Sequence, residues 1–108
     1  MPRKQKTPGN LQPLPEINKL IHEPARLNIM AHLYVVSSAD FLFLERQTGL
    51  TKGNLSSHLS KLESAGYVDI EKKFIDKIPR TLLKLTKPGR KAFKTYYDNM
   101  KNILKNFD

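Results

Sequence analysis

Hydrophobic side chains recur at three- and four-residue steps through the first third of the chain, which is the spacing of a helix that buries one face. The first such face comprises Leu14, Ile17, Leu20 and Ile21. We expect a helix beginning at Leu14 that Glu23-Pro24 interrupts. Proline fits the first turn of a new helix, because an N–H at that position has no helical partner. A second helix is therefore expected from Pro24 to about Val36.

The next segment, residues 37–66, contains a break, a short element and a third helix. Residues 37–40 are polar, and residues 41–48 predict a short helix or a brief strand running into one. Gly49 suits a left-handed residue that ends a helix. Thr51 can cap the following helix, since its hydroxyl accepts an N–H of the first turn. Gly66 ends this third helix.

The third helix has an unusual polar face. Leu55, Leu59 and Leu62 form one narrow apolar stripe that can dock on a core. The opposite side carries Gly53, Ser56, Ser57, Ser60, Lys61 and Ser64. Serine is a poor helix former, and a solvated helix normally carries Glu and Lys instead. Small polar side chains favour close approach to a partner rich in hydrogen-bonding groups, and DNA is such a partner.

After Gly66 the pattern changes to that of a two-stranded hairpin over residues 67–86. Tyr67, Val68 and Ile70 predict one strand, and Leu82, Leu83 and Leu85 predict the other. Ile78-Pro79-Arg80 is expected to form the turn, because proline disrupts a paired strand. Phe74, Ile75 and Ile78 are apolar residues in a segment expected to face solvent. They either pack under the hairpin or meet a partner.

A final helix is expected from Lys87 to about Phe107, with Thr86 as its cap and Pro88 in its first turn. Its apolar stripe comprises Phe93, Tyr96, Tyr97, Met100, Ile103, Leu104 and Phe107. The preceding core is too small to cover a stripe roughly 30 Å long. We therefore expect a homodimer whose interface contains these residues together with Leu14 and Ile17.

Size and composition restrict the class of protein. A chain of 108 residues with 39% hydrophobic content forms one small domain, or one domain with extensions. We expect a flexible basic arm at 1–13, a core domain at 14–86 and a dimerisation helix at 87–108. The chain lacks cysteine, which excludes disulfides and thiolate sites. Its three histidines lack ligand spacing, so no metal or other cofactor is expected.

The formal net charge of +9 is concentrated in two places. Residues 72–94 contain nine basic residues and one acidic residue, and the first seven residues contain three basic ones. Such a distribution is typical of a surface that binds a polyanion. A lysine-rich surface that serves solubility alone is the alternative.

The order of elements, a helix-turn-helix followed by a basic hairpin, resembles the winged helix-turn-helix transcriptional regulators of the MarR/ArsR type. The matching segments are Arg26–Leu33, Thr48–Val68 and Leu85–Ala92. The fold class expected is mainly α with a β-hairpin. The resemblance implies that the third helix enters the major groove, that the hairpin touches adjacent backbone or minor groove, and that terminal helices join a homodimer. A small-molecule effector is known in such regulators, but no pocket signature identifies one here.

The residue types support the same interpretation, because an exposed polar helix can reach base edges and phosphates. The candidate DNA-binding residues are Thr51, Lys52, Asn54, Ser56, Ser57, Ser60, Lys61, Lys72, Lys73, Lys77 and Arg80. Asn54 and Lys61 are the expected base readers, and Arg80 is a candidate for the minor groove. The expected partner is double-stranded DNA with a pseudo-palindromic operator.

Other classes of function fit less well. No catalytic triad, Cys–His pair or phosphate loop is present, so an enzyme is not expected. A winged helix used for protein contact within the transcription machinery is the main alternative. RNA binding fits less well because interleaved surface aromatics are missing. No apolar run has the roughly 20 residues needed to span a bilayer, and the start lacks a signal-peptide pattern, so we expect a cytoplasmic protein.

Overall fold

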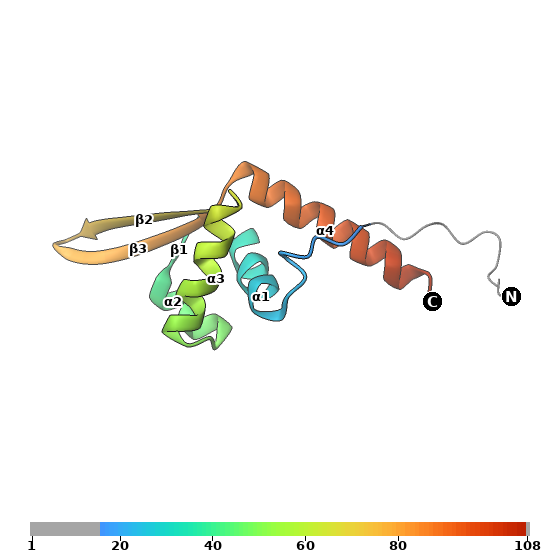
Figure 1. Cartoon of the computed structure of the whole chain (residues 1–108). Helices are drawn as coiled ribbons and strands as arrows, with labels where there is room; N and C mark the ends of the chain where they lie inside the picture. Colours follow the sequence, from blue (N-terminus) through green and yellow to red (C-terminus); the bar gives the residue numbers. More distant parts are fainter. Residues whose placement is uncertain (1–15, 108) are drawn as a thin grey trace, which may run out of the picture.

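A computed structural model describes residues 16–107 of the chain (Figure 1). Its elements are α1 (Pro24–Tyr34), β1 (Ala39–Asp40), α2 (Phe41–Thr48), α3 (Lys52–Ser64), β2 (Val68–Ile75), β3 (Ile78–Leu85) and α4 (Lys87–Lys105). The expected basic arm at 1–13 and the interface residue Leu14 lie outside the described residues.

The helix expected from Leu14 is wrong for residues 16–23, which form an extended stretch and a turn. Asn18 organises the turn, since its side-chain oxygen accepts the backbone N–H groups of Leu20 and Ile21 at 3.0 and 3.2 Å. Asparagine competes in this way with helical backbone hydrogen bonds. Ile21 is nonetheless fully buried, so the apolar pattern marked burial correctly but not the backbone conformation.

The helix boundaries in the middle of the chain follow local signals. Glu23 caps α1 by accepting the N–H of Arg26 at 2.8 Å, and Thr51 caps α3 by accepting the N–H of Asn54 at 3.2 Å. Gly49 ends α2 with a φ of 73°, a left-handed conformation that glycine adopts without steric cost. These caps confirm the predicted turn between α2 and α3.

The sheet has three strands rather than the expected two, in the antiparallel order β1-β3-β2. The hairpin turn is Asp76-Lys77, with φ values of 52° and 67°, and not the predicted Ile78-Pro79-Arg80. Pro79 pairs with Phe74, the second pair from the turn. In a two-residue hairpin that pair makes no hydrogen bonds between its strands, so β3 tolerates a residue without an N–H there.

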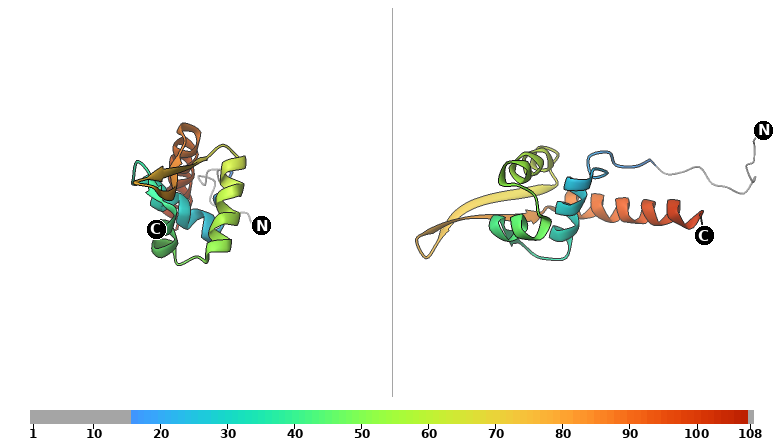
Figure 2. Two further views of the ribbon diagram at one scale, coloured as in Figure 1. Left: turned by 90° about the vertical axis from the view of Figure 1, so that its left-hand side faces the viewer. Right: turned by 90° about the horizontal axis from the view of Figure 1, so that it is seen from below.

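The core lies between α1, α2, α3 and the base of the sheet. Its fully buried side chains are Ile21, Ile29, Met30, Leu33, Leu44, Leu55, Leu59, Leu62, Val68 and Leu83. Two views in Figure 2, together with Figure 1, show the β2–β3 hairpin and the end of α4 extending in opposite directions from the helices. This arrangement is the winged helix fold that the sequence predicts.

Candidate nucleic-acid interface

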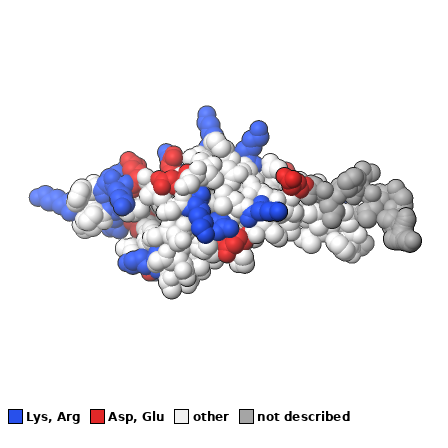
Figure 3. Space-filling model, viewed as in Figure 1, with Lys and Arg blue, Asp and Glu red and all other residues white. Residues whose placement is uncertain are grey.

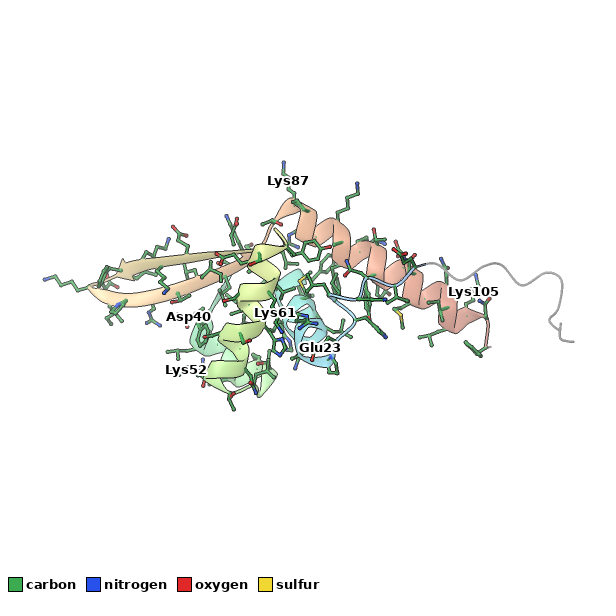
Figure 4. The ribbon with its side chains drawn as sticks, viewed as in Figure 1. Glu23, Asp40, Lys52, Lys61, Lys87 and Lys105 are labelled. Carbon is green, nitrogen blue, oxygen red and sulfur yellow. The ribbon has the colours of Figure 1, made fainter. Side chains whose placement is uncertain are left out.

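Helix α3 separates an apolar face from a polar one. Leu55, Leu59 and Leu62 are at most 2% exposed, so they fix the helix on the core. The seven residues predicted on this helix and its cap are all exposed: Thr51, Lys52, Asn54, Ser56, Ser57, Ser60 and Lys61. Figure 4 shows Lys52 and Lys61 projecting from α3 at different heights along it. The polar face is therefore available to a partner along the helix.

A charged cluster from three parts of the chain holds α3 against α1. Nη1 of Arg26 lies 3.1 Å from Nδ1 of His58 on α3, and its Nε donates to the carbonyl of Leu20 at 2.6 Å. Oε1 of Glu23 lies 4.0 Å from Nη1 of Arg26 and 4.0 Å from Nδ1 of His58. The hydrogen bond from the Arg26 backbone amide, aided by the nearby His58 and Arg26 charges, lowers the pKa of Glu23. His58 thus links α3 to α1 through Arg26.

The N-terminus of α3 is suited to an anion. The first turn of a helix has N–H groups without helical partners and carries partial positive charge. Thr51 satisfies one of these groups, that of Asn54, and Lys52 adds a cation at the same end. A phosphate facing this end would find both hydrogen-bond donors and positive potential.

A groove of about 410 Å³ lies between α3 and the hairpin. It is lined by Phe41, Lys52, Ser56, Leu59, Ser60, Ile70, Lys72, Thr81 and Leu83. Four predicted residues therefore share one groove, although 20 positions separate Lys52 from Lys72. Thr81 was missed by the sequence analysis; it pairs with Lys72 across the hairpin, a relation that the correct turn position would have revealed.

The hairpin lysines Lys72, Lys73 and Lys77 are exposed, as predicted. Arg80 is engaged instead, with Nη1 3.3 Å from the Asp40 carboxylate, which also caps α2. Lys73 lies 3.9 Å from Glu71, an exposed pair that is worth little in water. Among the four predicted hairpin cations, Lys72 and Lys77 are consequently the two for which the structure records no ion pair within residues 16–107.

The basic segment 72–94 does not form one continuous surface. Arg90 donates to the carbonyls of Tyr34 at 2.9 Å and Val36 at 2.7 Å, so it closes the C-terminal end of α1. Lys94 pairs with Asp98 on α4 at 2.9 Å. Figure 3 shows basic side chains over the hairpin and over the α3 face, with acidic ones between them. The charge of this segment therefore serves structure as well as surface.

The predicted dimer residues divide into two groups. Tyr96 is 6% exposed, its hydroxyl lies 2.8 Å from Nδ1 of His22, and burial raises its pKa. Phe93 packs on Tyr34 with ring centroids 4.9 Å apart, and Ile17 also packs on the core. Tyr96 therefore belongs to the core of the protomer, and Phe93 and Ile17 are half-buried against that core.

The second group lies toward the end of α4. Tyr97, Leu104 and Phe107 are 49%, 59% and 80% exposed, and Met100 and Ile103 are half-buried. Lys94 and Lys101 place their ammonium groups 5.8 and 5.1 Å from the Tyr97 ring centroid. The end of α4 thus presents apolar side chains to solvent.

Two further features concern the described part of the chain as a whole. Within residues 16–107, no three His, Cys, Asp or Glu side chains come together as a metal-binding group. No helix among these residues is both long and apolar enough to cross a membrane.

Comparisons with known proteins agree with this geometry. A model of the family described as winged helix DNA-binding domain matches residues 25–104. The protein MJ0432 of Methanocaldococcus jannaschii is 37% identical over 90 residues, which cover 83% of this chain and 98% of that protein.

Solved structures show the same likeness. A transcriptional regulator homologue of Pyrococcus horikoshii is 32% identical with a TM-score of 0.80, covering 84% of this chain and 90% of its own. A MarR-family transcriptional regulator of Silicibacter pomeroyi shares the fold at 20% identity and a TM-score of 0.63, covering 83% and 60%. By its fold, its exposed α3 face and these matches, the chain belongs to the winged helix DNA-binding family of transcriptional regulators.

Proposed function

We propose that this chain is a homodimeric, sequence-specific regulator that binds double-stranded DNA with α3 in the major groove and the β2–β3 hairpin on the adjacent backbone. The observation that carries this proposal is the exposed polar face of α3, which lies opposite three buried leucines. The major groove, about 12 Å wide, admits a helix. Side chains as small as serine allow the helix backbone to approach the bases closely.

The residues of α3 have different roles in this proposal. Asn54 and Lys61 are long enough to reach base edges and carry the donors and acceptors that distinguish bases in the major groove. Ser56, Ser57 and Ser60 contact phosphates directly or through water. The α3 N-terminus and Lys52 face a phosphate, which fixes the position of the helix on the duplex.

The hairpin supplies affinity rather than base selection. Strands of 8 residues extend roughly 26 Å at 3.3 Å per residue, enough to reach from one groove across the phosphate backbone to the next. Lys72 and Lys77 neutralise phosphates there. Arg80 reaches DNA in this proposal only by exchanging the Asp40 carboxylate for a phosphate, so its main role is to hold β3 against α2.

The end of α4 supports the homodimer. Tyr97, Met100, Leu104 and Phe107 are spaced three, four and three residues apart, which is the spacing of a seam between two paired helices. A second copy related by a two-fold axis places the same face opposite itself. Two copies then present two α3 helices to a pseudo-palindromic site.

Paired variants test this division of roles. Asn54→Ala or Lys61→Ala weakens binding to a selected site, with about 1–3 kcal/mol less discrimination against random duplex. Lys77→Ala weakens binding to both duplexes and reduces the slope of log K against log salt by about 1. Lys105→Ala removes the same charge at the far end of α4 and leaves the affinity for both duplexes unchanged (Figure 4). Fluorescence anisotropy at several salt concentrations measures the affinity of all four variants for each duplex.

The alternative role, a winged helix that contacts protein within the transcription machinery, gives a different pattern. In that case Asn54→Ala and Lys61→Ala do not alter the ratio of the two affinities. Equal effects of all variants on selected and random duplex contradict sequence-specific reading by α3.

A further inference from the structure

The end of the hairpin is apolar where a DNA-binding wing would be expected to be polar. Phe74, Ile75 and Ile78 are 74%, 41% and 52% exposed, so of the two alternatives left open by the sequence, packing under the hairpin does not hold. The register pairs Phe74 with Pro79 and Ile75 with Ile78, which places one apolar pair on each face of the ribbon. Water contact with these side chains is unfavourable, and a partner surface would remove it.

The orientation of Phe74 can be read from the alternation of the strands. Side chains two residues apart lie on the same face of a strand. Phe74 therefore shares its face with Lys72 and Ile70, both of which line the groove beside α3. Phe74 is therefore on the strand face that lines this groove, in the second pair from the turn, and the turn is the part of the hairpin farthest from the core (Figure 1).

The turn near Phe74 is short, so the tip of the hairpin is narrow. Asp76 and Lys77 both have positive φ and form a two-residue turn, the tightest connection between antiparallel strands. The minor groove is about 6 Å wide and too narrow for a flat two-stranded ribbon, but it admits the tip of a hairpin. The cations Lys72 and Lys77 on either side of Phe74 suit the phosphates that border such a groove.

We propose that Phe74, supported by Pro79, is an apolar wedge that enters the minor groove next to the major groove occupied by α3. The ring partly unstacks one base step and kinks the duplex toward the major groove. Ile75 and Ile78 contact sugars of the groove wall from the other face. This inference rests on the proposed DNA-binding function, and it assigns a partner to the side chains that the core leaves exposed.

Insertion of Phe74 adds a sequence preference at the base step that it unstacks. Pyrimidine–purine steps such as TA and CA unstack most easily. A chain that inserts Phe74 therefore prefers such a step at a fixed distance from the bases that α3 reads, without any hydrogen bond to that step. This preference is separate from the one that Asn54 and Lys61 impose.

The experiment compares the full chain with Phe74→Ala on a selected duplex that carries 2-aminopurine at the step and a dye at each end. The wild type raises the 2-aminopurine fluorescence and bends the duplex by about 20° or more. Phe74→Ala abolishes both signals and loses about tenfold in affinity, because an inserted aromatic ring contributes on this scale. The salt slope stays the same, since no charge is removed.

Two controls separate this inference from the proposed function. Val35→Ala truncates another apolar side chain, 79% exposed at the end of α1, and leaves the bend unchanged. Lys77→Ala reduces the salt slope whether or not Phe74 inserts. If Lys77→Ala acts as stated while Phe74→Ala bends and unstacks the duplex like the wild type, the wedge is overturned and a protein contact takes its place. If the wild type binds no duplex selectively, the proposed function itself fails.

Discussion

Gly89, at the start of α4, lies against the backbone of Tyr67, where the hairpin leaves α3. A Cβ on Gly89 would collide with the Tyr67 carbonyl group, and this atom belongs to the main chain, so it cannot turn away. The same carbonyl accepts the N–H of Thr86 at 3.0 Å. One glycine therefore sets how closely α4 approaches the junction between α3 and the hairpin.

Gly89→Ala is expected to destabilise the protein by about 1–3 kcal/mol, because the new methyl group forces the backbone apart. Gly53→Ala is the matched control: a Cβ at Gly53 meets nothing within 4 Å, and alanine favours the helix by about 0.5–1 kcal/mol. The free energy of unfolding of both variants is measured by urea titration, with circular dichroism as the signal. Equal midpoints for the two variants would show that the contact with Tyr67 does not limit the packing of α4.

Among the elements, α4 carries two different faces. Phe93 and Tyr96 pack inward on the core of the protomer, whereas Tyr97 and Leu104 face outward. The sequence pattern predicted one interface for all four residues, because periodicity indicates which residues are apolar but not which surface covers them. The outward face is the part of the helix that the dimer proposal requires.

Tyr97→Glu combined with Leu104→Glu is expected to produce a monomer, because two carboxylates in each helix would meet across the two-fold axis without partners. Asn102→Glu adds a carboxylate on the opposite side of α4 and leaves the dimer intact. Sedimentation equilibrium at micromolar concentration gives the mass of each variant. A wild type that is itself monomeric under these conditions refutes pairing through α4.

The elements predicted best were those with local signals. The cap at Thr51, the left-handed Gly49 and the leucine stripe together located α3, since each acts within a few residues of its own position. The turn around Asn18 was missed, because a buried apolar pattern does not reveal that a side chain has taken the place of helical hydrogen bonds.

Errors at the hairpin and the basic segment have a non-local origin. Proline suggested the turn, but the register moved it to Asp76-Lys77, where two residues without glycine adopt positive φ. The role of Arg90 depends on carbonyls more than 50 positions away, and that of Arg80 on Asp40. Charge counted along the sequence therefore overstated the surface that is open to DNA.

At the scale of the whole molecule, the hairpin and the end of α4 extend from opposite sides of the core (Figures 1 and 2). A dimer formed through α4 therefore leaves both hairpins and both α3 helices away from the seam. This separation predicts two half-sites on one duplex, with centres about one helical turn, 10–10.5 base pairs, or a multiple of it apart.

Selection of binding sites from a random double-stranded library with the full chain tests sequence-specific recognition by a dimer most directly. A dimer that reads sequence through α3 enriches a pseudo-palindrome whose half-sites are about one helical turn, or a multiple of it, apart, and Asn54→Ala or Lys61→Ala changes the enriched bases within each half-site. Two results would contradict sequence-specific recognition by a dimer. One is that no sequence is enriched over the unselected library, and the other is that a single asymmetric half-site is enriched by a protein that stays monomeric.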